Sequence, residues 1–246
     1  MIKITINCSL KDNLNRGDDM KLFKKLFVFL LITILVFSTI CFIIGYSTYN
    51  QELEEEPLLS RMDNVKNKEN YIKSSEISKN YLDAVVAVED HRFYEHGPID
   101  IISIGRALWT NLKHWELREG GSTITQQVAK NLVFSQEASF TRKLGELFAA
   151  YEIEKNYSKD EILEIYVNTC YFGDGYYGIY DACYGYYNKS PKDLTLDEAS
   201  MLAGIPNAPS VYSPSANMDL AKKRQKHVLN KMVEYGYISK EEATNI

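Results

Sequence analysis

Glu89 ends an apolar stripe in the segment KNYLDAVVAVED, residues 79–90, where its carboxyl group could do acid–base chemistry. One helix face carries apolar residues at the i, i+3, i+4 spacing, namely Leu82, Val85 and Val86. Glu89 holds position i+7 of that face, so it is partly desolvated, and the adjacent Asp90 adds like charge. Such a carboxylate is suited to exchange protons near neutral pH. Spacing alone also allows Glu89 to be solvated at the helix end.

Glu146 is a second candidate, in the predicted helix TRKLGELFAAYEIE, residues 141–154. One face of this helix is apolar and carries Leu144, Leu147, Phe148 and Tyr151. The opposite face combines small, charged and apolar residues, namely Arg142, Gly145, Glu146, Ala149 and Ile153. Glycine and alanine beside a carboxylate allow close approach, so we expect this face to line a cleft. The alternative is an ordinary exposed glutamate beside small residues.

The polar run EGGSTITQQVAKN, residues 119–131, leads directly into a helix pattern. Gly120 and Gly121 allow a tight turn, and Thr123 can cap the helix. The free N–H groups and the dipole of a helix start attract phosphate groups, so we expect an anion site here. Cationic side chains could complete it, namely Arg106, Lys130, Arg142 and Lys143. A double glycine before a capped helix is also common in proteins that bind no anion.

Five motifs, in order along residues 78–246, resemble the peptidoglycan glycosyltransferase domain of family 51. This domain occurs in class A penicillin-binding proteins and in monofunctional transglycosylases. The motifs are EDHRFYEH (89–96), GGSTITQQVAKN (120–131), RKLGE (142–146), KDEILEIYVNTCYFG (159–173) and LDEASMLAGIPNAPSVYSP (196–214). The chain departs from the family pattern at Pro98, where the first motif normally has glycine, and Gly97 lies one position earlier.

The resemblance implies a mainly α, lysozyme-like, two-lobed domain that polymerises lipid II. The 4-hydroxyl of the acceptor sugar would attack the anomeric carbon of the growing chain, with inversion and release of the lipid diphosphate. Glu89 would be the general base, and Glu146 the second essential carboxylate, assisting at the donor diphosphate or orienting groups there. Substrate-binding roles would fall to Asp90, Arg106, Ser122, Thr123, Gln126, Gln127, Lys130, Arg142 and Lys143.

Cofactors and partners follow from the same resemblance. Mg²⁺ or Mn²⁺ could sit on the donor diphosphate, although no residue is assigned as a metal ligand and His91 and His96 lack the spacing of a zinc site. The expected partners are lipid II, the growing glycan strand, membrane lipid, transpeptidases and other wall-synthesis proteins. The net charge of −5 argues against nucleic acid, which binds strongly basic surfaces.

Residues 26–44 contain no charged residue, and their helical length of roughly 30 Å matches a bilayer core. The apolar region of a cleaved signal peptide is shorter, so we expect a retained anchor. Lysines precede this stretch and QELEEEP follows it, which predicts a cytoplasmic N-terminus and an extracytoplasmic domain in the cell membrane. The expected organisation is a disordered cytoplasmic tail (1–21), a transmembrane anchor (22–46), a stalk (47–77) and the glycosyltransferase domain (78–246).

The outer domain is expected to be helical because Ser/Thr-x-x-Glu capping boxes recur and strand alternation is scarce. The boxes pair Ser158 with Glu161, Thr195 with Glu198 and Ser239 with Glu242, and Thr123 with Gln126 forms a variant. Residues 101–117 carry two tryptophans on an apolar helix pattern, which fits either membrane contact or a buried core helix. Cys170 and Cys183 are placed to form a disulfide, but their pairing is not decided by sequence.

Three alternatives to the polymerase remain. A lytic enzyme of lysozyme-like fold would share a catalytic glutamate but would not need the second, third and fourth motifs in this order. A non-catalytic scaffold of the wall-building machinery would not need both glutamates. A bifunctional penicillin-binding protein would need a Ser-x-x-Lys motif, which is absent from these 246 residues.

Overall fold

The structure is a computed structural model that describes residues 2–115, 120–134 and 139–246 of the chain. In these ranges the regular secondary structure is helical, and the one β feature is an isolated bridge between Tyr171 and Tyr177. The prediction of a mainly α fold is therefore confirmed.

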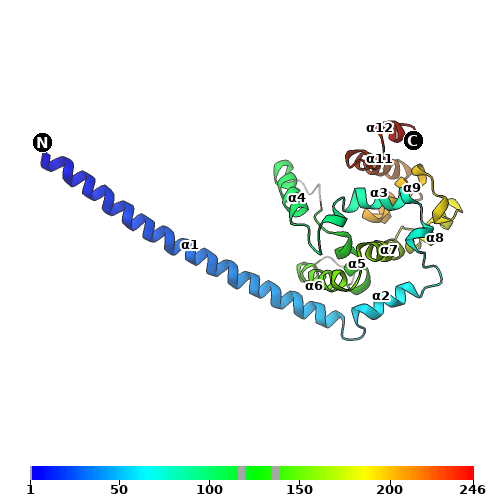
Figure 1. Cartoon of the computed structure of the whole chain (residues 1–246), viewed down its shortest axis with the longest axis horizontal. Coiled ribbons are helices and arrows are strands. Elements are labelled where there is room, and N and C mark those ends of the chain that lie inside the picture. Colours follow the sequence, from blue (N-terminus) through cyan, green and yellow to red (C-terminus); the bar gives the residue numbers. More distant parts are fainter. Residues whose placement is uncertain (1, 116–119, 135–138) are drawn as a thin grey trace.

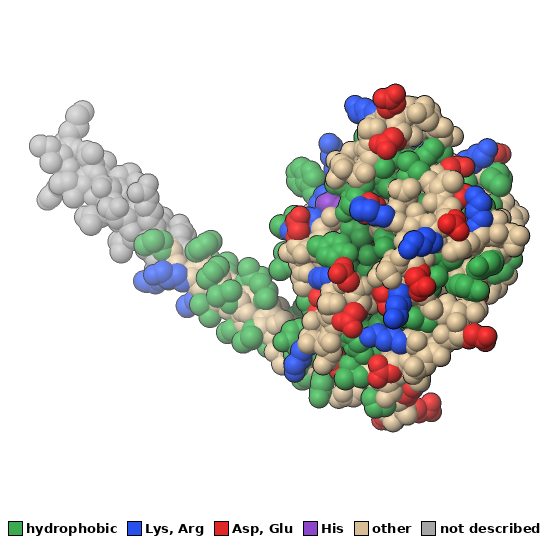
Figure 2. All heavy atoms as spheres, turned by 45° about the vertical axis from the view of Figure 1, so that its right-hand side comes forward, with side chains coloured by type: hydrophobic (Ala, Val, Ile, Leu, Met, Phe, Trp, Pro, Cys, Tyr) green, Lys and Arg blue, Asp and Glu red, His purple; other side chains and the backbone are tan. Residues whose placement is uncertain are grey.

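A single long helix, α1 (Ile2–Glu52), projects away from the remaining helices (Figure 1). Its stretch from Met20 to Glu52 contains an 18-residue window with a mean hydropathy of 3.0 and is long and apolar enough to cross a membrane. Figure 2 shows hydrophobic side chains covering this stretch, next to basic side chains at its start. Residues 1–21 were expected to be a disordered tail, but from Ile2 onwards they continue the helix, since no proline precedes Pro57.

The end of α1 packs against α6 (Phe140–Asn156), the helix that carries Glu146. The Phe148 ring lies 5.1 Å from that of Phe42 and 5.7 Å from that of Tyr46, measured between centroids. The two helix backbones approach closely at Gly45, where a Cβ atom would lie 3.0 Å from the Leu144 carbonyl oxygen. The apolar helix is thus joined directly to an element of the candidate site.

The faces of α6 differ from the expectation. The mixed face was expected to line a cleft, but Gly145, Ala149 and Ile153 on it are buried in the protein. The absence of a side chain at Gly145 admits the Phe134 ring, whose nearest atoms lie 2.9 Å from the position of a Cβ atom. Tyr151, assigned to the apolar face, is 68% exposed. Small residues on α6 therefore allow helix packing, and only its first turns reach the site.

The segment 47–77 also differs from the expected stalk, because it contains α2 (Leu58–Lys66) and a 3₁₀ turn (Ser74–Glu76). Leu58, Met62 and Val65 recur at i, i+4 and i+7 of α2, and all three are buried in the hydrophobic core. The charged residues around them conceal this stripe in the overall composition, and one of them, Arg61, is itself largely buried and donates to the Leu132 carbonyl oxygen. The folded domain therefore begins before residue 78.

Among the remaining helices, α3, α5, α7, α8, α9 and α11 contribute residues to one hydrophobic core. Helix α3 packs against α9 and α11, whereas α5 lies against both α6 and α7. The capping boxes predicted at Ser158, Thr195 and Ser239 are present at the starts of α7, α9 and α12. The helix bounds are α3 (Lys79–Glu89), α4 (Ile101–His114), α5 (Ile124–Val133), α7 (Lys159–Thr169), α8 (Gly178–Tyr187), α9 (Leu196–Gly204), α10 (Pro209–Tyr212), α11 (Met218–Glu234) and α12 (Lys240–Thr244). Short 3₁₀ turns occur at Phe93–Glu95, Pro191–Asp193 and Ile205–Asn207.

Helix α4 stands apart from the core and exposes its apolar face (Figure 1). Asp100 caps its start by accepting hydrogen bonds from the N–H groups of Ile102 and Ser103, and only Ala107 of the helix is buried. Trp109 is 71% exposed, and Trp115, directly after the helix, is 90% exposed. Of the two interpretations from sequence, the buried core helix is therefore wrong.

Cys170 and Cys183 are free thiols in the core and do not form a disulfide. Burial raises the pKa of each thiol to about 12, so both remain protonated at neutral pH.

Candidate active site

Both candidate glutamates line one cavity of about 720 Å³, bordered by α3, α4, α5, α6 and α11. The two positions lie far apart in the sequence and are brought together because α3 ends, and α6 begins, at this cavity. Seven of the predicted substrate-binding residues also line it, namely Arg106, Ser122, Gln126, Gln127, Lys130, Arg142 and Lys143.

Glu89 is the last residue of α3, and its side chain is only 10% exposed. Its Oε2 accepts a hydrogen bond of 2.8 Å from Nε2 of Gln127. Its Oε1 lies 3.6 Å from Nη2 of Arg224, beyond hydrogen-bonding distance, and has no hydrogen-bond partner among the described residues. One oxygen of the carboxylate is thus fixed by the protein, and the other keeps its accepting capacity.

Glu146 lies one turn inside α6, and its side chain is 2% exposed. Lys143 Nζ lies 2.6 Å from its Oε2, and Arg142 Nε lies 3.1 Å from its Oε1. Lys143 also donates to Ser122 Oγ at 2.9 Å. A buried carboxylate held between two cations fixes the position of both. This geometry favours an orienting role for Glu146 over proton donation.

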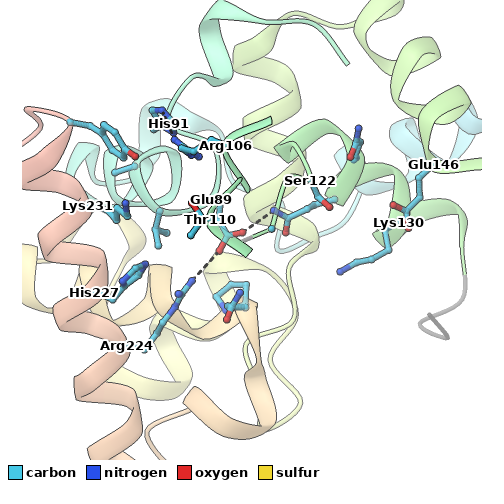
Figure 3. A pocket seen from close by; sticks show the side chains of 18 of the residues that line it. Glu89, His91, Arg106, Thr110, Ser122, Lys130, Glu146, Arg224, His227 and Lys231 are labelled. Atoms are coloured by element: carbon cyan, nitrogen blue, oxygen red, sulfur yellow. Dashed lines mark hydrogen bonds and ion pairs between the residues drawn. The ribbon is translucent and has the colours of Figure 1, made fainter. Parts of the chain in front are cut away.

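Basic side chains dominate the cavity lining. Its lysines and arginines are Arg106, Lys130, Arg142, Lys143, Arg224 and Lys231, against the two carboxylates of Glu89 and Glu146. Figure 3 shows Lys130 extending alone on the side of the cavity near Glu146. Within the described part of the chain its ammonium group has no hydrogen-bond or ion-pair partner. Because an unpaired lysine in a cationic cavity attracts negative charge, the lining is suited to an anionic ligand.

Asp90 and Thr123 do not line the cavity, although both were predicted to bind substrate. Asp90 is buried, and its Oδ2 accepts a hydrogen bond from the backbone N–H of Ile124, while its Oδ1 lies 2.8 Å from His96 Nε2. Thr123 caps α5 by accepting from the N–H of Gln126 and donates to the Pro98 carbonyl oxygen. Both residues anchor the start of α5.

The start of α5 offers fewer free N–H groups than the polar run suggested, and its role as an anion site stays a prediction. The N–H groups of Ile124 and Gln126 are already bonded to Asp90 and Thr123, which leaves little of the helix start for a ligand. Gln126 also differs from a reciprocal capping box, because its Nε2 donates to the Pro98 carbonyl oxygen instead. The cationic side chains supply the formal positive charge of the cavity.

A second wall of the cavity was missed by the sequence analysis. It is formed by His91, Thr110, His114, Pro206, Asn207, Arg224, His227, Lys231 and Tyr235. Arg224, His227 and Lys231 lie at i, i+3 and i+7 of α11, so their shared helix face was a signal available in the sequence. His91 stacks on Tyr235 with ring centroids 4.0 Å apart. Burial and the neighbouring Arg106 guanidinium lower the pKa of His91, which favours the neutral imidazole.

Possible metal ligands cluster outside the cavity. In the described ranges, ligand atoms of Asp90, His96 and Asp100 lie within 4.8 Å of one another. Their oxygens already accept hydrogen bonds, from Ile124 and His96 at Asp90 and from the first N–H groups of α4 and Arg92 at Asp100. We assign no metal to this cluster, and Mg²⁺ or Mn²⁺ on a diphosphate stays a prediction.

Comparisons with known proteins assign the chain to a family. Residues 55–233 match the family model described as Transglycosylase. Penicillin-binding protein 1F of Bacillus subtilis is 48% identical over 169 residues, which are 69% of this chain and 24% of that protein. Penicillin-binding protein 1A of Neisseria flavescens is 48% identical over 69% of this chain and 21% of its own length. The chain thus spans about a quarter of the length of these relatives.

One further relative is similar in length. A Cupriavidus necator protein named as a transglycosylase is 42% identical over 216 residues, which are 88% of this chain and 92% of that protein. Among solved structures, penicillin-binding protein 1A from Haemophilus influenzae aligns with 71% of this chain and 16% of its own, at 23% identity and a TM-score of 0.42. The family model spans most of the folded domain and both glutamates, and the chain therefore belongs to the transglycosylase family, glycosyltransferase family 51.

Proposed function

We propose that the chain polymerises lipid II, a disaccharide-pentapeptide on a polyprenyl diphosphate, into peptidoglycan strands with inversion at the anomeric carbon. The observation that carries this proposal is Glu89, a nearly buried carboxylate with one unoccupied oxygen in a cationic cavity. Family membership supports the same reaction class.

Glu89 would act as the general base through Oε1. As the acceptor 4-hydroxyl oxygen forms its bond to the anomeric carbon of the growing chain, its proton passes to Glu89, and the bond from that carbon to the diphosphate oxygen breaks. The proton then leaves Glu89 for solvent. Arg224 Nη2, which lies 3.6 Å from Oε1, places a positive charge beside this carboxylate.

The leaving diphosphate would be held by the cations on α5 and α6. Lys130, Lys143 and Arg142 can neutralise the charge that develops on the departing oxygen, so a strong general acid is not required. In Figure 3 Glu89 lies between Ser122, Lys130 and Glu146 on one side and Arg224, His227 and Lys231 on the other. This arrangement would place a donor diphosphate at the first group, with Glu89 at the junction of donor and acceptor.

The anchor and α4 would hold this cavity at the membrane that carries the substrate. Lysines before the span and acidic residues after it favour a cytoplasmic N-terminus and an extracytoplasmic domain. The exposed tryptophans of the α4 region are suited to the interface between lipid and water. Helix α4 borders the site, since it supplies Arg106, and α1 packs on α6, which carries Glu146. Transpeptidases and other wall-synthesis proteins remain predicted partners.

The experiment is a polymerisation assay with the purified full-length chain in lipid vesicles, using labelled lipid II with and without EDTA. Glycan strands resolved by gel electrophoresis are the expected product, and loss of product with EDTA would indicate a divalent cation on the diphosphate. A lytic enzyme would instead release fragments from intact wall, and a scaffold would do neither. Either of these results would overturn the proposal.

A further inference from the structure

The Gln127 side-chain amide is bonded to the protein at both ends. Its Nε2 donates to Glu89 Oε2 at 2.8 Å, and its Oε1 accepts from the Tyr166 hydroxyl at 3.3 Å. Tyr166 lies on α7 and is 1% exposed, beneath the cavity and without contact to its lumen. The Tyr166 hydroxyl on α7 is thereby connected, through the Gln127 amide on α5, to the Glu89 carboxylate at the end of α3.

We propose that Tyr166 is a positioning residue, whose hydroxyl fixes the orientation of the Gln127 amide and so determines which oxygen of Glu89 accepts the proton. This inference rests on the proposed role of Glu89 as general base. The amide nitrogen occupies Oε2, which leaves Oε1, the oxygen without a hydrogen-bond partner, to accept the proton.

The orientation matters because the two ends of an amide have opposite hydrogen-bonding character. With its oxygen toward Glu89, Gln127 would place an acceptor against a carboxylate, and the bond to Oε2 would be lost. Burial raises the pKa of Tyr166 well above its ordinary value, so the hydroxyl stays protonated and can donate to the amide oxygen at any working pH. Only one orientation of the amide then satisfies both neighbours.

Among the titratable groups around Glu89, none other than Tyr166 is shown donating a hydrogen bond to the Gln127 amide oxygen. Arg224 approaches from α11 at 3.6 Å, and the titratable groups below Glu89 are Tyr81, Tyr166 and Cys170. Burial raises the pKa of Tyr81 as it does that of Tyr166, and Cys170 remains a neutral thiol. Of these groups, Tyr166 is the one that the structure shows bonded to Gln127.

Tyr81 offers a matched control in the same core. It lies on α3, it is 0% exposed, and its hydroxyl has no hydrogen-bond partner in the described part of the chain. Tyr81→Phe and Tyr166→Phe therefore remove the same atom from equally buried rings, but only the second loses a bond to Gln127. The control therefore separates loss of the bond to Gln127 from loss of a buried hydroxyl group as such.

The first test measures lipid II polymerisation by the full-length chain in vesicles. Tyr166→Phe is expected to lower kcat about threefold to tenfold, the range of one net hydrogen bond, with KM changed less than twofold. The acidic limb of the pH dependence of kcat/KM should move to higher pH, because a hydrogen bond to the ionised carboxylate is weakened. Tyr81→Phe should leave kcat and the pH dependence unchanged.

The second test adds Gln127→Ala, which removes the connecting amide. If Tyr166 acts through Gln127, Tyr166→Phe will have less than a twofold further effect in that background. An equal loss in both backgrounds, or identical behaviour of Tyr166→Phe and Tyr81→Phe, would overturn the inference while wild-type polymerisation still supports the proposed function.

A third measurement does not depend on activity. In the ¹⁵N-labelled protein, the Gln127 side-chain amide should exchange its hydrogens with solvent several-fold faster in Tyr166→Phe than in wild type or Tyr81→Phe. Unchanged exchange would contradict the inference even if the chain made no polymer.

Discussion

Lys143 Nζ lies 2.6 Å from Glu146 Oε2, within an ion pair whose carboxylate side chain is 2% exposed. The two residues are one helical turn apart on α6, and Arg142 completes the cluster at 3.1 Å. Because both oxygens of this buried carboxylate lie against cations, Glu146 is suited to hold Lys143 and Arg142 toward a diphosphate.

Glu146→Gln should therefore lower kcat/KM by about 10²- to 10³-fold, since Lys143 and Arg142 lose the charge that positions them. The variant should also unfold at lower temperature, with a loss of about 2 kcal/mol for hydrogen bonds to a charged group. Polymerisation rates and thermal unfolding of the full-length chain measure the two effects. Glu154→Gln is the control on the same helix, because Glu154 pairs with Lys159 outside the cavity. It should lose stability but keep activity, and wild-type activity in Glu146→Gln would contradict the assignment.

Lys130→Met tests whether the Lys130 ammonium group contributes to substrate turnover and not to the stability of the fold. Because its ammonium group has no protein partner in the described ranges, stability should not decrease, whereas kcat/KM should fall about 10²-fold or more. Lys159→Met is the comparison, since Lys159 bonds to Glu154 and lies over the Phe93 ring. That variant should unfold earlier and polymerise normally. The reverse pattern would show that Lys130 has a structural role.

The predicted contact of α4 with lipid can be followed by intrinsic fluorescence. Trp109 and Trp115 are the two tryptophans of the chain, and both are more than two-thirds exposed. In vesicles that contain lipids brominated on the acyl chains, the emission of the full-length chain should be quenched and shifted to shorter wavelength. Quenching by aqueous iodide should be weak. Strong iodide quenching with no effect of brominated lipid would exclude the contact.

His96 gives the domain a pH dependence of known sign. Burial opposes its protonation, but the hydrogen bonds to Asp90 and the Gly97 carbonyl outweigh burial and raise the pKa of His96 above 6.5. Its ion pair with Asp90 is thus fully present below the unfolded pKa and is lost as pH rises through the folded pKa. His96→Gln should lower Tm by about 1–2 °C more at pH 6 than at pH 9. A larger difference at pH 9 would contradict this sign.

Sequence reasoning identified the two glutamates because each lies on a helix pattern beside a recognisable motif. The same reasoning placed Asp90 and Thr123 in the binding site, since adjacency in a motif does not tell which side of the backbone a residue faces. In the structure both point into the protein and bond the start of α5. A polar residue next to a catalytic one can thus serve the scaffold.

The wall on α11 was missed for a different reason. Arg224 lies 135 positions after Glu89 in the chain, and its approach to that carboxylate depends on the packing of α11 against α3. Only tertiary structure supplies this relationship, although the spacing of Arg224, His227 and Lys231 indicated one charged face. Likewise, α2 was assigned to a stalk because its charged residues outweighed a three-residue apolar stripe in the composition.

The most direct measurement of the central claim is lipid II polymerisation by Glu89→Gln in the full-length chain. The substitution keeps the size of the side chain and removes the oxygen that would accept the proton. Glu95→Gln, an exposed residue paired with Arg92 outside the cavity, is the control. The account predicts no detectable polymer from Glu89→Gln, with thermal unfolding that still shows a folded domain and full activity in the control. Polymer formation by Glu89→Gln at the wild-type rate would contradict it.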